Sequence, residues 1–304
     1  MVRQHNELPV PVSTHLHGGR TPPESDDYPT DLIPPKNLAH DHSMEGHGSM
    51  GVGGSRHHKD YVYPLEQRAA TLWYHDHRMD FTGPQVWRGL AGFHIIRDDE
   101  EHALPLPKGD KDVPLMICDR SFDEDGSFLY PSLDPSLQGK PGVEDDYMDG
   151  VLGDTILVNG APWPVLEVSA TKYRFRILNA SNARPYEFAL EPRNDAPFVQ
   201  VGSDGGLLSA PILHRTIRIA QAERFDVVID FSKNDVGAGI TLKNRMGEGK
   251  RQQTSCDFVS PAKRTTTEQS HDNFRIWRSS KDSRNLVPGA RASSALRGLA
   301  TRGW

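Results

Sequence analysis

The 304-residue sequence predicts an all-β protein. No long stretch repeats apolar residues at the helical period, and 23 Pro and 27 Gly supply many turns. Several segments instead alternate apolar and polar residues, as half-buried strands do. In residues 173–177, Tyr, Phe and Ile face one way and two Arg the other, and residues 225–231 show a similar alternation. Asn159-Gly160 is a hairpin-turn signal.

The chain is long enough for about two domains. We expect a first domain in residues 1–105, a Pro- and Gly-containing linker in 106–112 and a second domain in 113–245. Residues 246–304 hold 11 Lys/Arg and 5 Asp/Glu, so their net charge is +6 and that of the preceding residues is −12. This basic, Ser/Thr/Arg-rich tail predicts disorder, and a basic interaction tail is the alternative.

Composition excludes several classes of function. The net charge of −6 argues against a nucleic-acid partner. No apolar run reaches transmembrane length and the N-terminus has no signal-peptide pattern, so no membrane association is expected and the compartment stays unknown. Cys118 and Cys256 do not make a disulfide framework, and Cys118 lies in an apolar run that predicts a buried strand.

Two His-x-His pairs dominate the N-terminal third of the chain. They are His15 with His17 and His75 with His77. Side chains at i and i+2 of a strand point to the same face, so two such strands side by side would bring four imidazoles together. Four imidazoles suit copper, zinc, iron or nickel, and raw affinity favours copper. Solvent-facing histidines are the alternative, but they would not explain the glycines at 18 and 19, which let backbone pass close to a site.

These motifs carry a family resemblance. The sequence resembles bacterial multicopper oxidases of the spore-coat laccase (spore coat protein A), bilirubin oxidase and phenoxazinone synthase type. The resemblance covers about residues 8–235. It is carried by HLHGG at 15–19, PESD at 23–26, WYHDH at 73–77, GLAGF at 89–93, DTILVNG at 154–160, RFRILNASN at 174–182 and GSDGGLL at 202–208.

The resemblance implies cupredoxin-like Greek-key β-sandwiches and a copper enzyme. Such oxidoreductases couple one-electron oxidation of phenolic, bilirubin-like or metal-ion reductants to the reduction of dioxygen to water. By motif, His15 would bind the type 2 copper, and His17, His75 and His77 the type 3 pair. Asp26 matches an acidic residue near the cluster and would serve as a proton donor.

Other family features are missing from this sequence. A type 1 copper needs one Cys, two His and a weak axial ligand, yet neither Cys has a histidine neighbour. We therefore expect the type 1 site to be absent, the first domain to lack its front strands and the third domain to be missing. The chain alone would be inactive. A non-catalytic copper-binding fragment is one alternative, and a zinc hydrolase with Asp26 or Asp76 as general base is another.

Residues 40–58 form a His- and Met-containing insertion, with His40, His42, Met44 and His47 near its start. We interpret it as a flexible loop with incidental histidines. Copper capture by its His and Met side chains is the alternative hypothesis.

Overall fold

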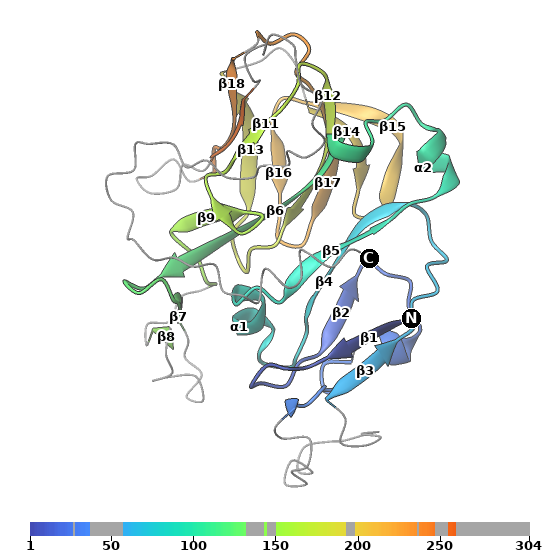
Figure 1. Cartoon of the computed structure of the whole chain (residues 1–304), viewed down its shortest axis with the longest axis vertical. Coiled ribbons are helices and arrows are strands. Elements are labelled where there is room, and N and C mark those ends of the chain that lie inside the picture. The colour runs from blue at the N-terminus through green and yellow to red at the C-terminus, as the bar shows by residue number, and fades with distance from the viewer. Residues whose placement is uncertain are drawn as a thin grey trace, which may run out of the picture. The chain divides into compact units, whose positions relative to one another are not determined.

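The computed structural model shows two compact units, which are described separately (Figure 1). Unit 1 is Met1–Leu104 with Asp204–Leu207, and unit 2 is Pro105–Ser203 with Leu208–Trp304. The structure describes residues 1–26, 28–36, 57–131, 143–144, 150–192, 198–235, 237–246 and 255–259, with backbone alone for 143–144 and 255–259.

Unit 1 contains a three-stranded sheet in the order β2-β4-β5 and a two-stranded sheet of β1 and β3. Its elements are β1 (Val2–His5), β2 (Thr14–His17), η1 (Pro23–Ser25), β3 (His58–Tyr61), β4 (Ala70–Asp76), α1 (Thr82–Trp87), β5 (Ala91–Ile96) and α2 (Asp99–Ala103). Strand β2 begins at Thr14, and just before it Val12 forms an isolated antiparallel bridge with Ile33. The short helix α1 was not predicted.

One face of the three-stranded sheet is apolar. Leu16, Leu72 and Ile96 are buried together, and Tyr74 packs against them. A Cβ at position 92 would collide with the Tyr74 ring, so only glycine fits on the neighbouring strand. This packing turns the side chains of odd-numbered β4 residues toward the opposite face.

Unit 2 is a β-sandwich. Its larger sheet runs β10-β9-β6-β12-β17-β14-β15, with β7 paired to β6 and β8 to β7, and its smaller sheet runs β11-β19-β18-β13-β16. The elements are η4 (Gly109–Lys111), β6 (Asp112–Phe122), β7 (Phe128–Pro131), β8 (Val143–Glu144), β9 (Thr155–Val158), β10 (Ala161–Pro162), β11 (Val165–Glu167), β12 (Lys172–Asn179), β13 (Tyr186–Glu191), β14 (Phe198–Ser203), β15 (Gly206–His214), β16 (Ile217–Ile219), β17 (Arg224–Asp230), β18 (Gly239–Asn244) and β19 (Ser255–Val259).

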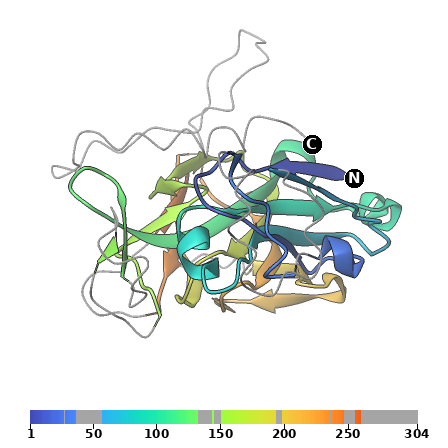
Figure 2. The same cartoon turned by 90° about the horizontal axis from the view of Figure 1, so that it is seen from below.

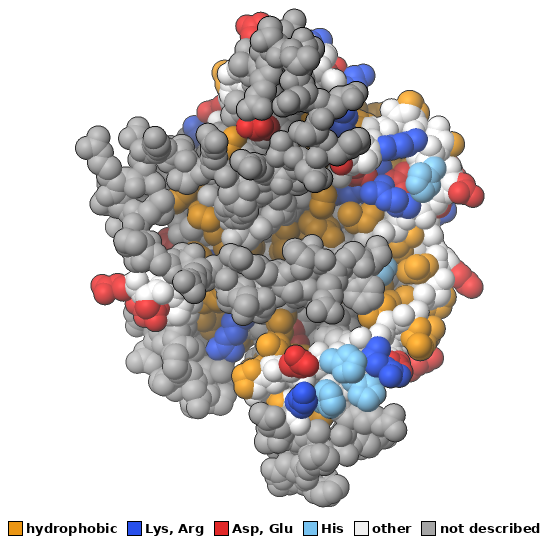
Figure 3. All heavy atoms as spheres, viewed as in Figure 1, with side chains coloured by type: hydrophobic (Ala, Val, Ile, Leu, Met, Phe, Trp, Pro, Cys, Tyr) orange, Lys and Arg blue, Asp and Glu red, His pale blue; other side chains and the backbone are white. Residues whose placement is uncertain are grey.

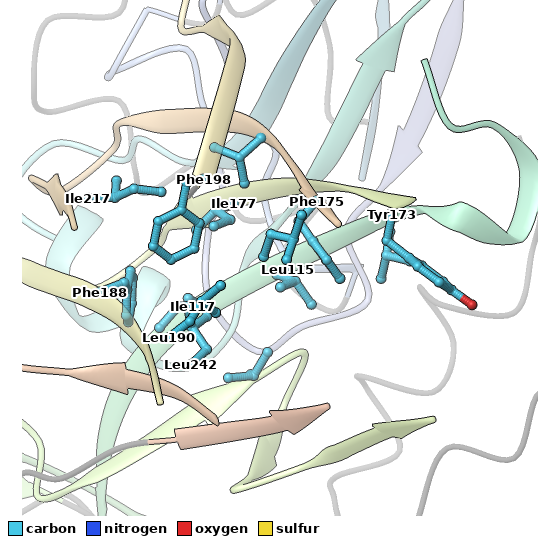
Figure 4. Close-up of a cluster of buried hydrophobic side chains, with 14 of the residues drawn as sticks. Leu115, Ile117, Tyr173, Phe175, Ile177, Phe188, Leu190, Phe198, Ile217 and Leu242 are labelled. Carbon is cyan, nitrogen blue, oxygen red and sulfur yellow. The ribbon is translucent and has the colours of Figure 1, made fainter. Parts of the chain in front are cut away.

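The core of unit 2 lies between these sheets. Phe175 and Ile177 of the larger sheet pack into the same buried cluster as Phe188, Leu190 and Leu242 of the smaller one (Figure 4). This core bears out the apolar face predicted for residues 173–177. The predicted turn is present as well, because Asn159 and Gly160 have φ of 50° and 81° and join the antiparallel strands β9 and β10.

The polar face of β12 is also buried. Arg174 forms two hydrogen bonds with Asp226, and Arg176 forms two with Asp112 at 2.8 and 3.0 Å. These four side chains are between 1 and 6 % exposed. A buried charge is tolerated when it is paired and hydrogen-bonded, so the arginines are structural members of the sheet.

The predicted tail contains one element that was not expected. Strand β19 pairs antiparallel with β18 and parallel with β11, so the small sheet extends beyond residue 245. Its five residues give too short an alternation to be recognised in a Ser- and Arg-rich context. Residues 247–254, 260–304 and 37–56 lie outside the described residues, and the last of these ranges contains most of the His/Met insertion. The interpretation of residues 40–58 as a loop is wrong at its end, because His58 begins strand β3 and pairs with β1. Among the described residues, no helix has the length and apolar character needed to span a bilayer.

Candidate metal centre

The two His-x-His pairs lie on adjacent antiparallel strands, as predicted. In the β2–β4 ladder His15 is directly opposite His75, and His17 is opposite Trp73. His77 follows the last residue of β4 and donates its backbone N–H to Ser13 O over 2.7 Å. The two His-x-His pairs are therefore offset along the ladder by two residues. His15 lies opposite His75, and its ring is also next to that of His77.

The four imidazole rings form one cluster. The His15 ring centroid lies 5.4 Å from that of His75, 5.3 Å from that of His77 and 5.6 Å from that of His17. The His75 centroid lies 5.7 Å from both His17 and His77. His75 is 8 % exposed, and the other three are half-buried.

Ring nitrogens of three of these residues converge. His17 Nδ1 lies 3.5 Å from His75 Nε2. One ligand nitrogen each of His15, His17 and His75 lies within 4.8 Å of the others. His77 Nδ1 is buried and has no hydrogen-bond partner among the described residues. A buried polar atom without a partner is costly unless something binds it, so the geometry fits an ion.

Backbone carbonyls set the orientation of two rings. His75 Nδ1 is 2.8 Å from the carbonyl oxygen of Asp76, and His15 Nδ1 is 3.3 Å from that of Asp26. A carbonyl oxygen only accepts, so Nδ1 of each ring carries the proton. The Nε2 atoms of His15 and His75 then have lone pairs available for a metal, a common arrangement in metal sites.

Asp76 stands between the ligand candidates in sequence but on the other side of the strand, as expected. Its carboxylate accepts hydrogen bonds from the backbone N–H of Ser13 and of Arg78, each over 3.0 Å, and it is 3 % exposed. It therefore ties the start of β2 to the end of β4. Sequence reasoning missed this bracing role, because its only signal is an acidic residue at the end of a buried strand.

An indole closes one side of the cluster. The Trp73 ring centroid lies 4.4 Å from that of His75 and 5.3 Å from that of His17. Trp73 is 5 % exposed and shares the histidine face of β4, whereas Tyr74 lies on the apolar face. The indole therefore packs beside the imidazoles and limits the access of water to them.

Burial sets the protonation state of the central ligand candidate. Loss of solvent, with smaller contributions from the three neighbouring histidines, lowers the pKa of His75 to about 4. The hydrogen bond to Asp76 O opposes this shift but does not cancel it. His75 is consequently neutral at pH 7, which is the form that binds metal.

Asp26, the predicted proton donor, lies next to the cluster. One oxygen of its carboxylate is 3.3 Å from His15 Nδ1 and 3.3 Å from the Thr21 hydroxyl. The carboxylate is 51 % exposed, so it can exchange protons with solvent. Its part in the chemistry stays a prediction.

The chain is similar to known multicopper oxidases. A family model described as Multicopper oxidase matches residues 52–101. A laccase of Bacillus stratosphericus is 46 % identical over 246 residues, covering 81 % of this chain and 45 % of the relative. A bilirubin oxidase of Albifimbria verrucaria is 34 % identical over 255 residues, covering 81 % and 38 %. The McoA multicopper oxidase of Aquifex aeolicus superposes with a TM-score of 0.66 at 32 % identity, covering 85 % and 52 %.

The chain belongs to the multicopper oxidase family, and its relatives include laccases and a bilirubin oxidase. The predicted all-β, cupredoxin-like fold is confirmed by this likeness and by the strand content. The chain spans less than half the length of the laccase and bilirubin oxidase relatives that it matches.

Proposed function

We propose that this chain contributes His15, His17, His75 and His77 to the oxygen-reducing copper centre of a multicopper oxidase. The parent reaction takes single electrons from phenolic, bilirubin-like or metal-ion reductants and reduces dioxygen to water. The observation that carries the proposal is the 3.5 Å approach of His17 Nδ1 and His75 Nε2 across the β2–β4 ladder.

This approach supports a shared ion for His17 and His75. Two nitrogens that each lie about 2 Å from one metal are roughly 3 Å apart, close to the observed separation. The unpartnered Nδ1 of His77 and the available Nε2 of His15 supply ligands for further ions of the type 3 and type 2 kind. All four side chains are imidazoles, so the set suits copper.

Copper supplies one-electron chemistry by cycling between its two common oxidation states. The protein's part is to hold four imidazoles in register and to exclude water with Trp73. The Asp26 carboxylate lies 3.3 Å from His15 Nδ1 and is half-exposed to solvent, so it is suited to deliver protons to the centre.

Among the side chains that the structure describes, no thiol stands beside two imidazoles to form an electron entry point. A type 1 copper needs a thiolate with two imidazoles. The Cys118 thiol is buried beside Asp119, and burial raises its pKa, which disfavours the thiolate. We therefore propose that this chain alone binds copper at a half site, without turnover. A zinc hydrolase is less well supported, because one of its two candidate general bases, Asp76, is engaged with backbone N–H groups, which leaves only Asp26.

The test is to load the purified chain with copper, count bound ions and record its visible and paramagnetic resonance spectra. Oxygen consumption with a dimethoxyphenol is measured in parallel. We expect colourless or weakly absorbing protein with one or two coppers per chain beyond any surface sites, and no oxygen uptake. A strong blue thiolate-to-copper band would contradict the absence of a type 1 site. Protein that binds no copper at His15, His17, His75 or His77 would refute the proposed function.

A further inference from the structure

A second group of histidines lies on the other sheet of unit 1. His5 ends strand β1, His58 begins strand β3, and His57 directly precedes β3. Their ring centroids are 5.3 Å apart for His5 and His58, 5.7 Å for His5 and His57, and 5.8 Å for His57 and His58. None of these residues belongs to the four-histidine cluster on β2 and β4. We call this group the β1–β3 histidine patch.

Strand pairing fixes the two central members of the patch. His5 and His58 are direct partners in the antiparallel β1–β3 ladder. Directly opposite residues have Cβ atoms about 5 Å apart on one face of the ribbon. Asn6 donates its backbone N–H to His57 O over 2.7 Å, so the ladder continues past the strand and brings His57 alongside. Figures 1 and 2 show β1 in dark blue close to the N-terminus.

The patch is accessible to an ion. His5 is exposed, and His57 and His58 are half-buried. Figure 3 shows histidine side chains gathered on the face over β1 and β3, beside lysine or arginine and acidic side chains. The neighbouring charges cancel, because Arg3 forms two hydrogen bonds of 2.6 Å with Asp60 on the same ribbon. The local field therefore does not repel a cation.

We propose that His5, His57 and His58 form a surface site for a divalent transition-metal ion, with Cu²⁺ bound most tightly. Three imidazoles held about 2 Å from one ion in a tetrahedral arrangement have ring centroids about 5 Å apart, which is close to the observed spacings, and ring rotations would turn one nitrogen of each ring toward the ion. His5 is exposed and can make such a rotation without disturbing packing. The Irving–Williams order places Cu²⁺ first among divalent ions on nitrogen ligands.

This site does not depend on the proposed oxidase function, since it shares no residue with the four-histidine cluster. It would hold copper at the surface of the domain that carries that cluster. Open coordination positions on the solvent side would be filled by water, so the ion should exchange readily. The histidines of residues 37–56 are not part of the proposed site.

The experiment counts Cu²⁺ ions bound by the full chain in equilibrium dialysis and compares three variants. The variants are His5→Asn with His58→Asn, His5→Gln alone, and the control His102→Asn, whose exposed imidazole lies on α2. We expect the double variant to lose one Cu²⁺ per chain and the single variant to bind that ion at least tenfold more weakly. The control should match the wild-type chain.

Circular dichroism verifies that each variant is folded. If the double variant does not fold, the copper affinity of His5→Gln still tests the proposal. Paramagnetic resonance of the wild-type chain should show, beside any signal from copper at the four-histidine cluster, a Cu²⁺ signal with imidazole nitrogen coupling that disappears in the double variant. The same copper count and affinity in wild type, His5→Gln and a folded double variant would overturn the proposal.

Discussion

Two regions of this chain bury polar side chains in opposite ways. On β12, Arg174 makes two hydrogen bonds to Asp226 of β17, and Arg176 makes two to Asp112 of β6. On β2 and β4, imidazole nitrogens face one another, and His77 Nδ1 has no hydrogen-bond partner among the described residues. The first set is complete within the protein, whereas we propose that an ion completes the second.

The difference gives a criterion for separating structure from function. Buried charges whose hydrogen bonds are satisfied stabilise a sheet or fix its register, and they require no ligand. A buried nitrogen without a partner among the described residues, such as Nδ1 of His77, is costly in the free protein, and binding a metal would recover that cost. The predictions below test this contrast, from the largest expected effect to the smallest.

Removing one charge from the paired network should have the largest effect on stability. Asp226→Ala leaves Arg174 buried without its main partner, so the free energy of unfolding should fall by about 3–5 kcal/mol. Copper binding by the folded protein should be unchanged. Urea unfolding and a copper count measure the two effects.

The control for this variant is Arg218→Ala, which removes a surface ion pair with Glu187. Arg218 is 78 % exposed, so the change should be within about 1 kcal/mol. Equal losses of stability in Asp226→Ala and Arg218→Ala would contradict the structural role of the buried network.

Acid should destabilise the metal-free protein through His75. The unfolded chain protonates His75 at its ordinary pKa near 6.5, whereas the folded chain does so only at about 4. Stability from this residue is therefore intact above pH 6.5 and is lost as the pH falls toward 4, by about 3 kcal/mol at most. Urea midpoints between pH 7 and 4 should be less pH-dependent in His75→Ala. If the urea midpoints of the wild type and of His75→Ala changed equally with pH, the lowered pKa of His75 would be contradicted.

Removing the brace between the two histidine strands should have a moderate effect. Asp76→Ala leaves the buried N–H groups of Ser13 and Arg78 without an acceptor, which should cost about 1–3 kcal/mol. Copper affinity should fall roughly 10- to 100-fold although no ligand is removed. The conservative variant Asp76→Asn keeps one oxygen acceptor, so it should recover part of the stability and part of the copper affinity. Copper affinity unchanged in Asp76→Ala would show that the brace does not position the ligands.

The smallest effect is expected from the proposed proton donor. Asp26→Asn keeps the shape of a half-exposed side chain, so the copper count and stability should change little. In a parent enzyme with all its copper sites, the same substitution should slow oxygen reduction and alter its pH profile. Loss of copper from the Asp26→Asn half site would indicate a structural role instead.

Much of the histidine site could be predicted from sequence because the period of a strand is two residues. That rule alone places His15 with His17 and His75 with His77 on common faces. The stagger that brings His17 Nδ1 to His75 Nε2 could not be predicted, since it depends on the ladder register and on Asp76 bonding to Ser13. Pairing of distant strands leaves little trace in local sequence.

The fold also has features that local sequence predicts and features that depend on residues far away in the chain. The alternation in residues 173–177 predicted strand β12 and its buried face, but the burial of Arg174 and Arg176 depends on carboxylates 52 and 64 residues away. Strand β19 was missed, because its pairing with β11 and β18 is not visible in five residues of a basic segment. The β1–β3 histidine patch was missed as a site for the same reason, since His5 and His58 are 53 positions apart.

The most direct test of the central claim is the copper content of His75→Ala against that of His94→Ala. Both histidines are on the same sheet, and burial lowers the pKa of each, but His94 packs against Tyr63 and is not in the four-histidine cluster. We predict that His75→Ala loses the copper bound at the half site, and that His94→Ala keeps it. Equal copper content in the two folded variants would contradict the assignment of His15, His17, His75 and His77 as copper ligands.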